Sequence, residues 1–177
     1  MTEIRLGKTE IRVPKNGFGA LPIQRISVQA ATHLLQKAYE NGIRFFDTAR
    51  FYTDSEEKIG QALASVRGHI YLASKTMATT VADFWADLET SLSLLQTEYL
   101  DIYQFHNPSF CPKPGDGSGL YEAMLEAKAQ GKVHHIGISN HRLSVAREAL
   151  ECGLYDTLQF PFCYLATEKE LEIVALA

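Results

Sequence analysis

Four side chains that can donate a proton or stabilise a charge lie at the ends of expected strands or a few residues after them. Asp47 and Lys75 each end an apolar run, and so does His106. Tyr52 follows Asp47 by five residues. A phenol is a weak acid near neutrality, with a reference pKa of about 10. A lysine ammonium about 4 Å away would favour the phenolate by on the order of 4 kcal/mol at an effective dielectric of ~20. That energy would lower the pKa of the phenol by roughly 3 and make its proton transferable at neutral pH.

This chemistry, proton donation to a carbonyl oxygen, gives each residue a role. Tyr52 donates the proton, and Lys75 sets the acidity of its hydroxyl. Asp47 keeps Lys75 charged and in place, while His106 donates a hydrogen bond that orients the carbonyl. Because no protein side chain can deliver a hydride, reduction of that carbonyl requires a nicotinamide cofactor. Taken singly, each residue is better explained as a cap, a surface charge or a packing group. Their joint occurrence at successive strand ends favours a site.

Other chemistries fit the sequence less well, and no metal site is expected. Four histidines have no neighbours at metal-ligand spacing and are interpreted as structural: His69, His134, His135 and His141. Cys111 lies in an expected loop without a base partner, so we do not expect a nucleophilic cysteine. A metal-dependent barrel hydrolase that uses Asp47 and His106 stays open as an alternative. An elemental analysis without stoichiometric metal would exclude it.

Composition indicates one soluble globular domain. The chain has 177 residues, of which 46% are hydrophobic and 21% charged, and its net charge is −4. This acidic balance argues against nucleic-acid or anionic-membrane partners. No N-terminal apolar stretch in this sequence resembles a signal peptide, and no apolar run reaches the ~18 residues of a membrane span. The three cysteines form no CxxC motif, so we expect a reducing, cytoplasmic setting.

The elements that position the candidate residues alternate between strands and helices. The strands are expected at 17–21, 43–47, 69–75, 99–106, 132–140 and 157–160, and a helix follows each. Capping residues predict helix starts at Ser27, Thr80 and Thr167, and either Thr53 or Asp54 caps the helix of 54–65. Residues 4–13 alternate as a short hairpin that ends at Pro14. Such alternation indicates a parallel sheet, closed either as a doubly wound sheet or as a barrel.

The stretch 17–21 contains Gly17 and Gly19, and the absence of a side chain at these positions would let a ligand approach the backbone closely. It resembles the start of a dinucleotide fingerprint, but Pro22 stands where the third glycine should be, which disfavours a Rossmann site. Gly19 and Ala20 are retained as candidate cofactor contacts.

Several motifs together resemble those of the aldo-keto reductase family. They are Phe46-Asp47-Thr48-Ala49-x-x-Tyr52, the strand-end residues Lys75 and His106, and Gly137-Ile138-Ser139-Asn140. The resemblance implies a (β/α)8 barrel with an N-terminal hairpin across its bottom. It implies reduction of aldehydes and ketones with a nicotinamide cofactor, usually NADPH, with NADH as the alternative. It also implies that Tyr52 is the proton donor, with Asp47, Lys75 and His106 as its partners. The nicotinamide carboxamide would be held by Ser139, Asn140 and Gln159.

Two stretches narrow the branch of the family. Tyr52–Glu57 and Gln104–Pro108 are similar to bacterial and archaeal members that carry a C-terminal ferredoxin-like iron–sulfur segment. A cluster is expected only if such a segment exists beyond Ala177. Phe162-Cys163 departs from the family, because many members have Tyr-Asn there.

The resemblance further implies that residues 1–177 form a truncated barrel domain in which strands seven and eight are absent. We therefore expect this chain alone to be a weak or inactive NADP-dependent enzyme. Its sheet edges near Gly17–Leu21 and Thr157–Phe160 would be open to self-association. Its expected partner is a small carbonyl substrate, with neither nucleic acid nor membrane. A non-catalytic truncated barrel that serves as a binding or assembly module is the alternative.

Overall fold

A six-stranded parallel sheet carries the candidate residues. The computed structural model describes residues 2–177. The strands are hydrogen-bonded in chain order: β3 (Phe18–Gly19), β4 (Phe45–Asp47), β5 (Tyr71–Thr76), β6 (Leu100–His106), β7 (Val133–Ser139) and β8 (Thr157–Gln159). A separate antiparallel hairpin consists of β1 (Glu3–Arg5) and β2 (Arg12–Pro14).

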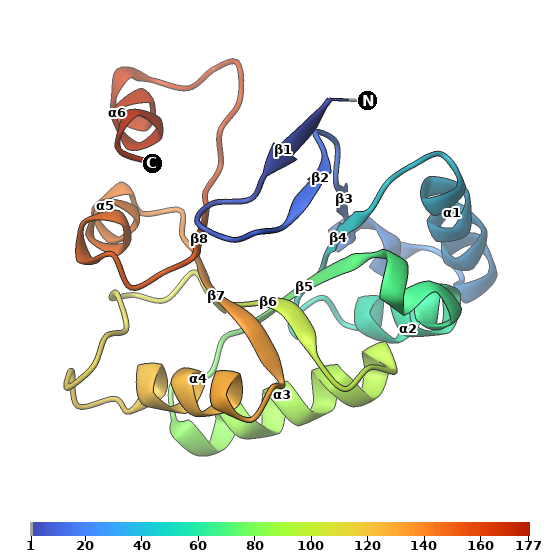
Figure 1. Cartoon of the computed structure of the whole chain (residues 1–177), viewed down its shortest axis with the longest axis horizontal. Helices are drawn as coiled ribbons and strands as arrows, with labels where there is room; N and C mark the ends of the chain where they lie inside the picture. The colour runs from blue at the N-terminus through green and yellow to red at the C-terminus, as the bar shows by residue number, and fades with distance from the viewer. Residues whose placement is uncertain (1) are drawn as a thin grey trace.

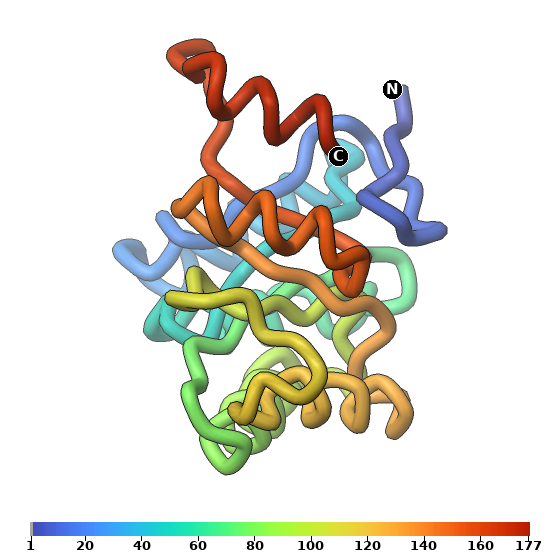
Figure 2. The backbone as a smooth tube through the Cα atoms, turned by 90° about the vertical axis from the view of Figure 1, so that its left-hand side faces the viewer, coloured from blue at the N-terminus to red at the C-terminus, as the bar shows by residue number. Residues whose placement is uncertain are grey.

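The helices lie on the outer side of the curled sheet, and the hairpin lies in its hollow (Figure 1). They are α1 (Val28–Glu40), α2 (Ser55–Leu63), α3 (Val81–Leu95), α4 (Leu120–Ala129), α5 (Leu143–Cys152) and α6 (Glu168–Leu176), with 3-10 helices η1 (Leu21–Arg25) and η2 (Ala64–His69). Figure 2 shows α6 alongside α5. Arg147 of α5 and Glu172 of α6 form an ion pair of 2.8 Å between the two helices. The expected partial (β/α)8 barrel with an N-terminal hairpin is confirmed, because a doubly wound sheet would have helices on both faces.

Most helix starts follow the predicted caps. Ser27 Oγ accepts from the Ala30 amide and Thr80 Oγ1 from the Asp83 amide, while Thr167 heads a capping box. The prediction for α2 is wrong in its mechanism. Asp54 occupies the N-cap position without a side-chain cap bond, because its carboxylate pairs with Lys58 Nζ at 2.8 Å instead.

The ends of the sheet differ most from the expected elements. The strand expected at 17–21 shortens to two residues and continues into η1, which the sequence did not indicate. Leu34 of α1 is apolar and yet 43% exposed. Both features occur at the edge of the sheet, where β3 pairs with β4 alone. Fewer strands are available there to hydrogen-bond with β3, and less apolar surface is available for α1 to cover.

Among residues 2–177, no helix has the length and hydrophobicity needed to cross a bilayer.

The hairpin packs on the interior of the sheet. Ile11 and Val13 form a buried cluster with Ala73 of β5 and Ile102 of β6. The Lys8 amide donates to the Asp156 carbonyl at 2.8 Å, just before β8. The hairpin thereby joins one end of the chain to the last strand and leaves the carboxyl ends of the strands free for a site.

Gly60 allows close packing of α2 on α3. A Cβ at this position would lie 2.1 Å from the Leu94 carbonyl oxygen. We expect Gly60→Ala to lower the free energy of unfolding by ~1–3 kcal/mol, because the helices must move apart. Gly68→Ala, where an added Cβ meets nothing within 4 Å, is the control and should change it by less than ~0.5 kcal/mol. Urea unfolding measures both, and equal stability of the two variants would contradict the packing argument.

Candidate active site

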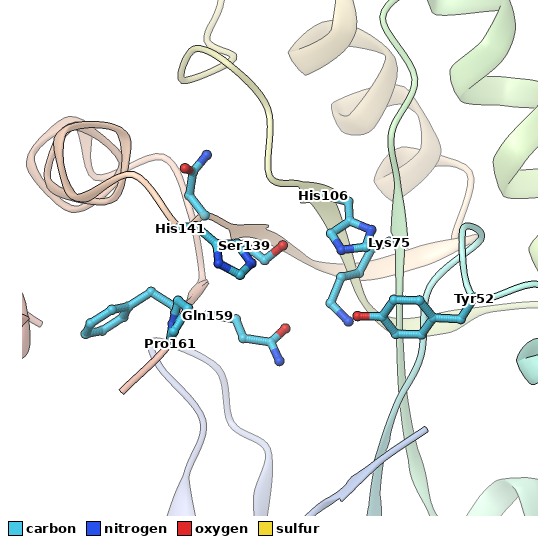
Figure 3. Close-up of a pocket in the computed structure, with 9 residues that line it drawn as sticks. Tyr52, Lys75, His106, Ser139, His141, Gln159 and Pro161 are labelled. Carbon is cyan, nitrogen blue, oxygen red and sulfur yellow. The ribbon is translucent and has the colours of Figure 1, made fainter. Parts of the chain in front are cut away.

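The four candidate residues meet at the carboxyl edge of the sheet. Asp47 ends β4, Lys75 lies near the end of β5, and His106 ends β6. Tyr52 lies in the loop between β4 and α2. This loop is fixed to β5 by two backbone bonds of 2.9 Å, from the Thr48 amide to Ala73 and from the Arg50 amide to Lys75. A cavity of about 200 Å³ opens here, and Figure 3 shows the residues around it. Its lining residues are Tyr52, Lys75, His106, Ser139, Asn140, His141, Gln159, Phe160 and Pro161.

Lys75 is the buried cation of this site. Its Nζ donates to Asp47 Oδ2 and to the Thr48 carbonyl oxygen, both at 2.7 Å. Only 2% of the residue is exposed, and this burial lowers the pKa of the ammonium group. The Asp47 carboxylate acts in the opposite direction and favours the charged form. Asp47 and the Thr48 carbonyl thus both contact the ammonium group, while the catalytic role of Asp47 stays a prediction.

The Tyr52 ring lies beside both the lysine and the histidine, and its hydroxyl is directed toward Lys75 (Figure 3). Lys75 Nζ is 5.3 Å from the centroid of the tyrosine ring. The ring packs edge-on against His106, with centroids 5.6 Å apart. Burial raises the pKa of the Tyr52 phenol, and the Asp47 carboxylate raises it further. This direction differs from the expectation that Lys75 lowers the pKa, because burial disfavours the phenolate and the Asp47 carboxylate adds to that effect. Tyr52 is therefore protonated at neutral pH.

His106 is a neutral imidazole at pH 7. Burial lowers its pKa to about 4, with smaller contributions from Lys75 and His141. Its Nδ1 is buried and has no hydrogen-bond partner in the part of the chain that the structure describes. A neutral imidazole has one N–H donor and one acceptor nitrogen. His106 can therefore donate to an oxygen in the cavity without adding a positive charge.

Comparison with known proteins shows the family to which the chain belongs. A family model described as "Aldo/keto reductase family" matches residues 15–177. The chain belongs to this family. It is 34% identical to "Methylglyoxal reductase DkgB" of Salmonella typhi over 146 residues, which cover 78% of this chain and 52% of that protein. The chain thus spans about half the length of the methylglyoxal reductases that it matches.

Solved structures of the family have the same fold. An aldo-keto reductase of Bacillus halodurans in its holo form superposes with a TM-score of 0.79 at 27% identity, over 92% of this chain and 58% of that one. The Bombyx mori aldo-keto reductase in complex with NADP gives a TM-score of 0.77 at 22% identity, over 99% and 62%. At that identity the second likeness concerns the fold alone. The resemblance found in the sequence is confirmed at the level of the family, whereas the iron–sulfur branch stays a prediction.

The candidate cofactor contacts of this aldo-keto reductase differ in how available their polar atoms are. Ser139 of β7 and Gln159 of β8 line the cavity. Asn140 lines it too, but its Nδ2 donates to the Pro108 carbonyl and its Oδ1 accepts from the Arg142 amide, both at 2.8 Å. The Gln159 amide also has partners, but at longer distances, 3.3 Å to Gln104 Nε2 and 3.5 Å to Asp47 Oδ2. The hydroxyl of Ser139 and the amide of Gln159 are therefore less firmly engaged than Asn140 and better suited to a carboxamide.

The other two cofactor candidates lie beside the cavity without lining it. Gly19 is opposite Asp47 in the register of β3 and β4, and an added Cβ there meets nothing within 4 Å. The Ala20 amide donates to the Asp47 carbonyl at 2.8 Å, and the Ala20 carbonyl accepts from Ser55 Oγ at 3.1 Å. Gly19 thus leaves room for a ligand, while the polar backbone atoms of Ala20 are hydrogen-bonded within the protein.

Sequence analysis missed two residues of the site. His141, interpreted as structural, lines the cavity. Gln104 was not assigned a role, yet it is buried and contacts Asp47 at 3.3 Å. The alternation of side chains along β6 carries a signal for Gln104, since it shares a strand face with His106. Residues 2–177 contain no group of three or more histidine, cysteine or acidic side chains arranged as metal ligands, so the hydrolase alternative lacks a ligand set there.

We expect His106 to titrate with a midpoint of about 4 in NMR spectra of the folded protein. Lys75→Met should raise this midpoint, because it removes a neighbouring positive charge. The midpoint should stay below the ordinary value of about 6.5, since burial is the larger cause. Lys37→Met, which removes an exposed lysine of α1, is the control. An unchanged midpoint in Lys75→Met would contradict the coupling.

The same titration makes stability depend on pH. The unfolded chain binds the proton first as pH falls below about 6.5, because the folded pKa of His106 lies lower. The contribution of His106 to stability is therefore present above that pH, and is lost progressively as pH falls to about 4. His106→Gln should reduce this part of the pH dependence in urea unfolding. A full dependence in the variant would assign it to other groups.

Proposed function

We propose that this site reduces the carbonyl group of a small aldehyde or ketone, with NADPH as the cofactor and NADH as the alternative. The observation that carries the proposal is the placement of one phenol beside a buried ammonium–carboxylate pair and a neutral imidazole in a single cavity. These are the groups needed to supply a proton and to stabilise charge at one oxygen atom.

Tyr52 would be the proton donor. Its raised pKa keeps the hydroxyl protonated at neutral pH, so the proton is present when substrate arrives. The carbonyl oxygen becomes alkoxide-like as its carbon is reduced, and an alkoxide is more basic than a phenolate. The proton therefore moves from Tyr52 Oη to that oxygen. Lys75 would stabilise the phenolate left behind, and Asp47 would keep the ammonium group charged.

His106 would orient the substrate. Its ring packs against Tyr52, so an N–H directed into the cavity reaches the oxygen that Tyr52 protonates. Because the pKa of His106 is about 4, the imidazole does not compete with Tyr52 as an acid near pH 7. The histidine then contributes a hydrogen bond to the developing negative charge without transferring its own proton.

Ser139 and Gln159 would hold the carboxamide of the cofactor, since their polar groups line the cavity. A bound nicotinamide supplies hydride chemistry that side chains lack. Two comparisons support this choice: the printed name of the Salmonella relative is that of a methylglyoxal reductase, and a relative from Papaver somniferum, 31% identical over 79% of this chain, is named "NADPH-dependent codeinone reductase 1-2". The expectation of weak turnover by the 177-residue chain alone stays a prediction.

Tyr52→Phe tests the proposal. In a version of the protein that carries the complete barrel, we expect kcat for NADPH-dependent reduction of methylglyoxal to fall by ~10²-fold or more, because the proton donor is removed. The dissociation constant of NADPH, measured by fluorescence titration, should change little. Tyr39→Phe is the matched control, since Tyr39 lies on α1 and its ring faces Arg44. Normal turnover in Tyr52→Phe, or a protein that does not bind NADPH, would overturn the proposal.

A further inference from the structure

Gln104 is a buried polar residue on the inner face of the sheet. It lies on β6 two residues before His106, so the two side chains project from the same face of the strand. Its neighbours in register are Lys75 on β5 and Gly137 on β7. Only 3% of Gln104 is exposed, so its amide needs partners within the protein.

The Gln104 amide links two residues of the site. Its Nε2 donates to Asp47 Oδ1 and to Gln159 Oε1, both at 3.3 Å. These contacts use both N–H donors of the amide. Gln159 Nε2 donates in turn to Asp47 Oδ2 at 3.5 Å, the oxygen that also accepts from Lys75. One carboxylate, one ammonium and two amides therefore form a closed network across β4, β5, β6 and β8.

Charge determines the orientation of both amides. If the Gln104 amide were turned over, its carbonyl oxygen would face the Asp47 carboxylate, and two acceptors repel. The orientation of Gln104 then presents an N–H to Gln159, which accepts it through Oε1 and directs Nε2 toward Asp47. In Figure 3 the Gln159 amide extends into the cavity on the side of Lys75.

Gly137 provides the space for this bridge. A Cβ at position 137 would lie 2.7 Å from Gln104 Cγ and 2.5 Å from Thr157 Oγ1. The bare backbone of β7 lets the Gln104 side chain extend toward Gln159 on the next strand. Packing alone does not require a glutamine here, because Ile102 fills the neighbouring position on the same face of β6 with an apolar side chain.

We propose that Gln104 is a positioning residue that couples the proton-donor half of the cavity to its cofactor half. One amide holds the Asp47 carboxylate against Lys75 and sets the orientation of the Gln159 amide. The assignment of Gln159 to the nicotinamide carboxamide rests on the proposed function. Hydride and proton must reach the same carbonyl group in a narrow range of geometries, so a shared bridge keeps both halves aligned.

The first test needs no cofactor. Gln104→Met preserves the length of the side chain and removes its hydrogen bonds. We expect the side-chain amide resonances of Gln159 to move toward those of solvent-exposed glutamines in ¹⁵N-resolved NMR spectra. Ile102→Val, which changes packing on the same strand face, should leave them in place. Should Gln104→Met fail to fold, Gln104→Asn withdraws the amide by one methylene and should give the same displacement. Unchanged Gln159 resonances in the folded variant overturn the inference.

The second test compares two ligands that differ by the nicotinamide. NADP⁺ should bind the Gln104→Met variant about five- to tenfold more weakly than the wild type, while 2′-phospho-ADP-ribose should bind both equally. Equal weakening of the two ligands would indicate general damage and overturn the positioning role. A wild-type protein that binds neither ligand would refute the proposed function, and the resonances of Gln159 would still decide the role of Gln104.

Discussion

The buried ion pair of Lys75 and Asp47 is the interaction on which the site depends. Burying a lysine that is only 2% exposed costs free energy unless its ammonium group is paired. Here a carboxylate oxygen and a backbone carbonyl oxygen both lie 2.7 Å from Lys75 Nζ. The pair forms only if β4 and β5 keep their register, with Asp47 opposite Ala73. A slip of one residue would turn each side chain to the other face of the sheet. The chemistry of the cavity therefore depends on the pairing of β4 and β5.

A second set of buried charges holds the loop that carries Tyr52. Glu56 is 1% exposed, accepts from Ser74 Oγ at 2.5 Å and pairs with Arg50. Lys58 is also buried, and its Nζ donates to the carbonyls of Ile23 and Ile26 at 2.9 and 2.8 Å. These contacts tie the start of α2 to β5 and to η1. The position of the phenol is thus fixed from both sides of the loop, which a proton donor requires.

Burial dominates the proton chemistry of the cavity. It is the largest cause of the lowered pKa of Lys75, the lowered pKa of His106 and the raised pKa of Tyr52. In each case it favours the uncharged form. The carboxylate of Asp47 opposes this effect at Lys75 and reinforces it at Tyr52. The same environment thus keeps a proton on the phenol and off the imidazole, which separates the two groups into a donor and a neutral hydrogen-bonding partner.

The sequence by itself determined the six strand–helix units, the caps at Ser27, Thr80 and Thr167, and the strand-end positions of Asp47, Lys75 and His106. These features depend on periods of two and 3.6 residues and on local turn chemistry, which a short stretch of chain contains. Only the tertiary structure decided the direction of the Tyr52 pKa and the bridge made by Gln104. Each of these depends on distances between strands far apart in the chain: Gln104 and Asp47 are 57 residues apart, and Gln104 and Gln159 are 55 apart. The pKa of Tyr52 is raised by burial and by the Asp47 carboxylate, and both effects arise only when the strands pair.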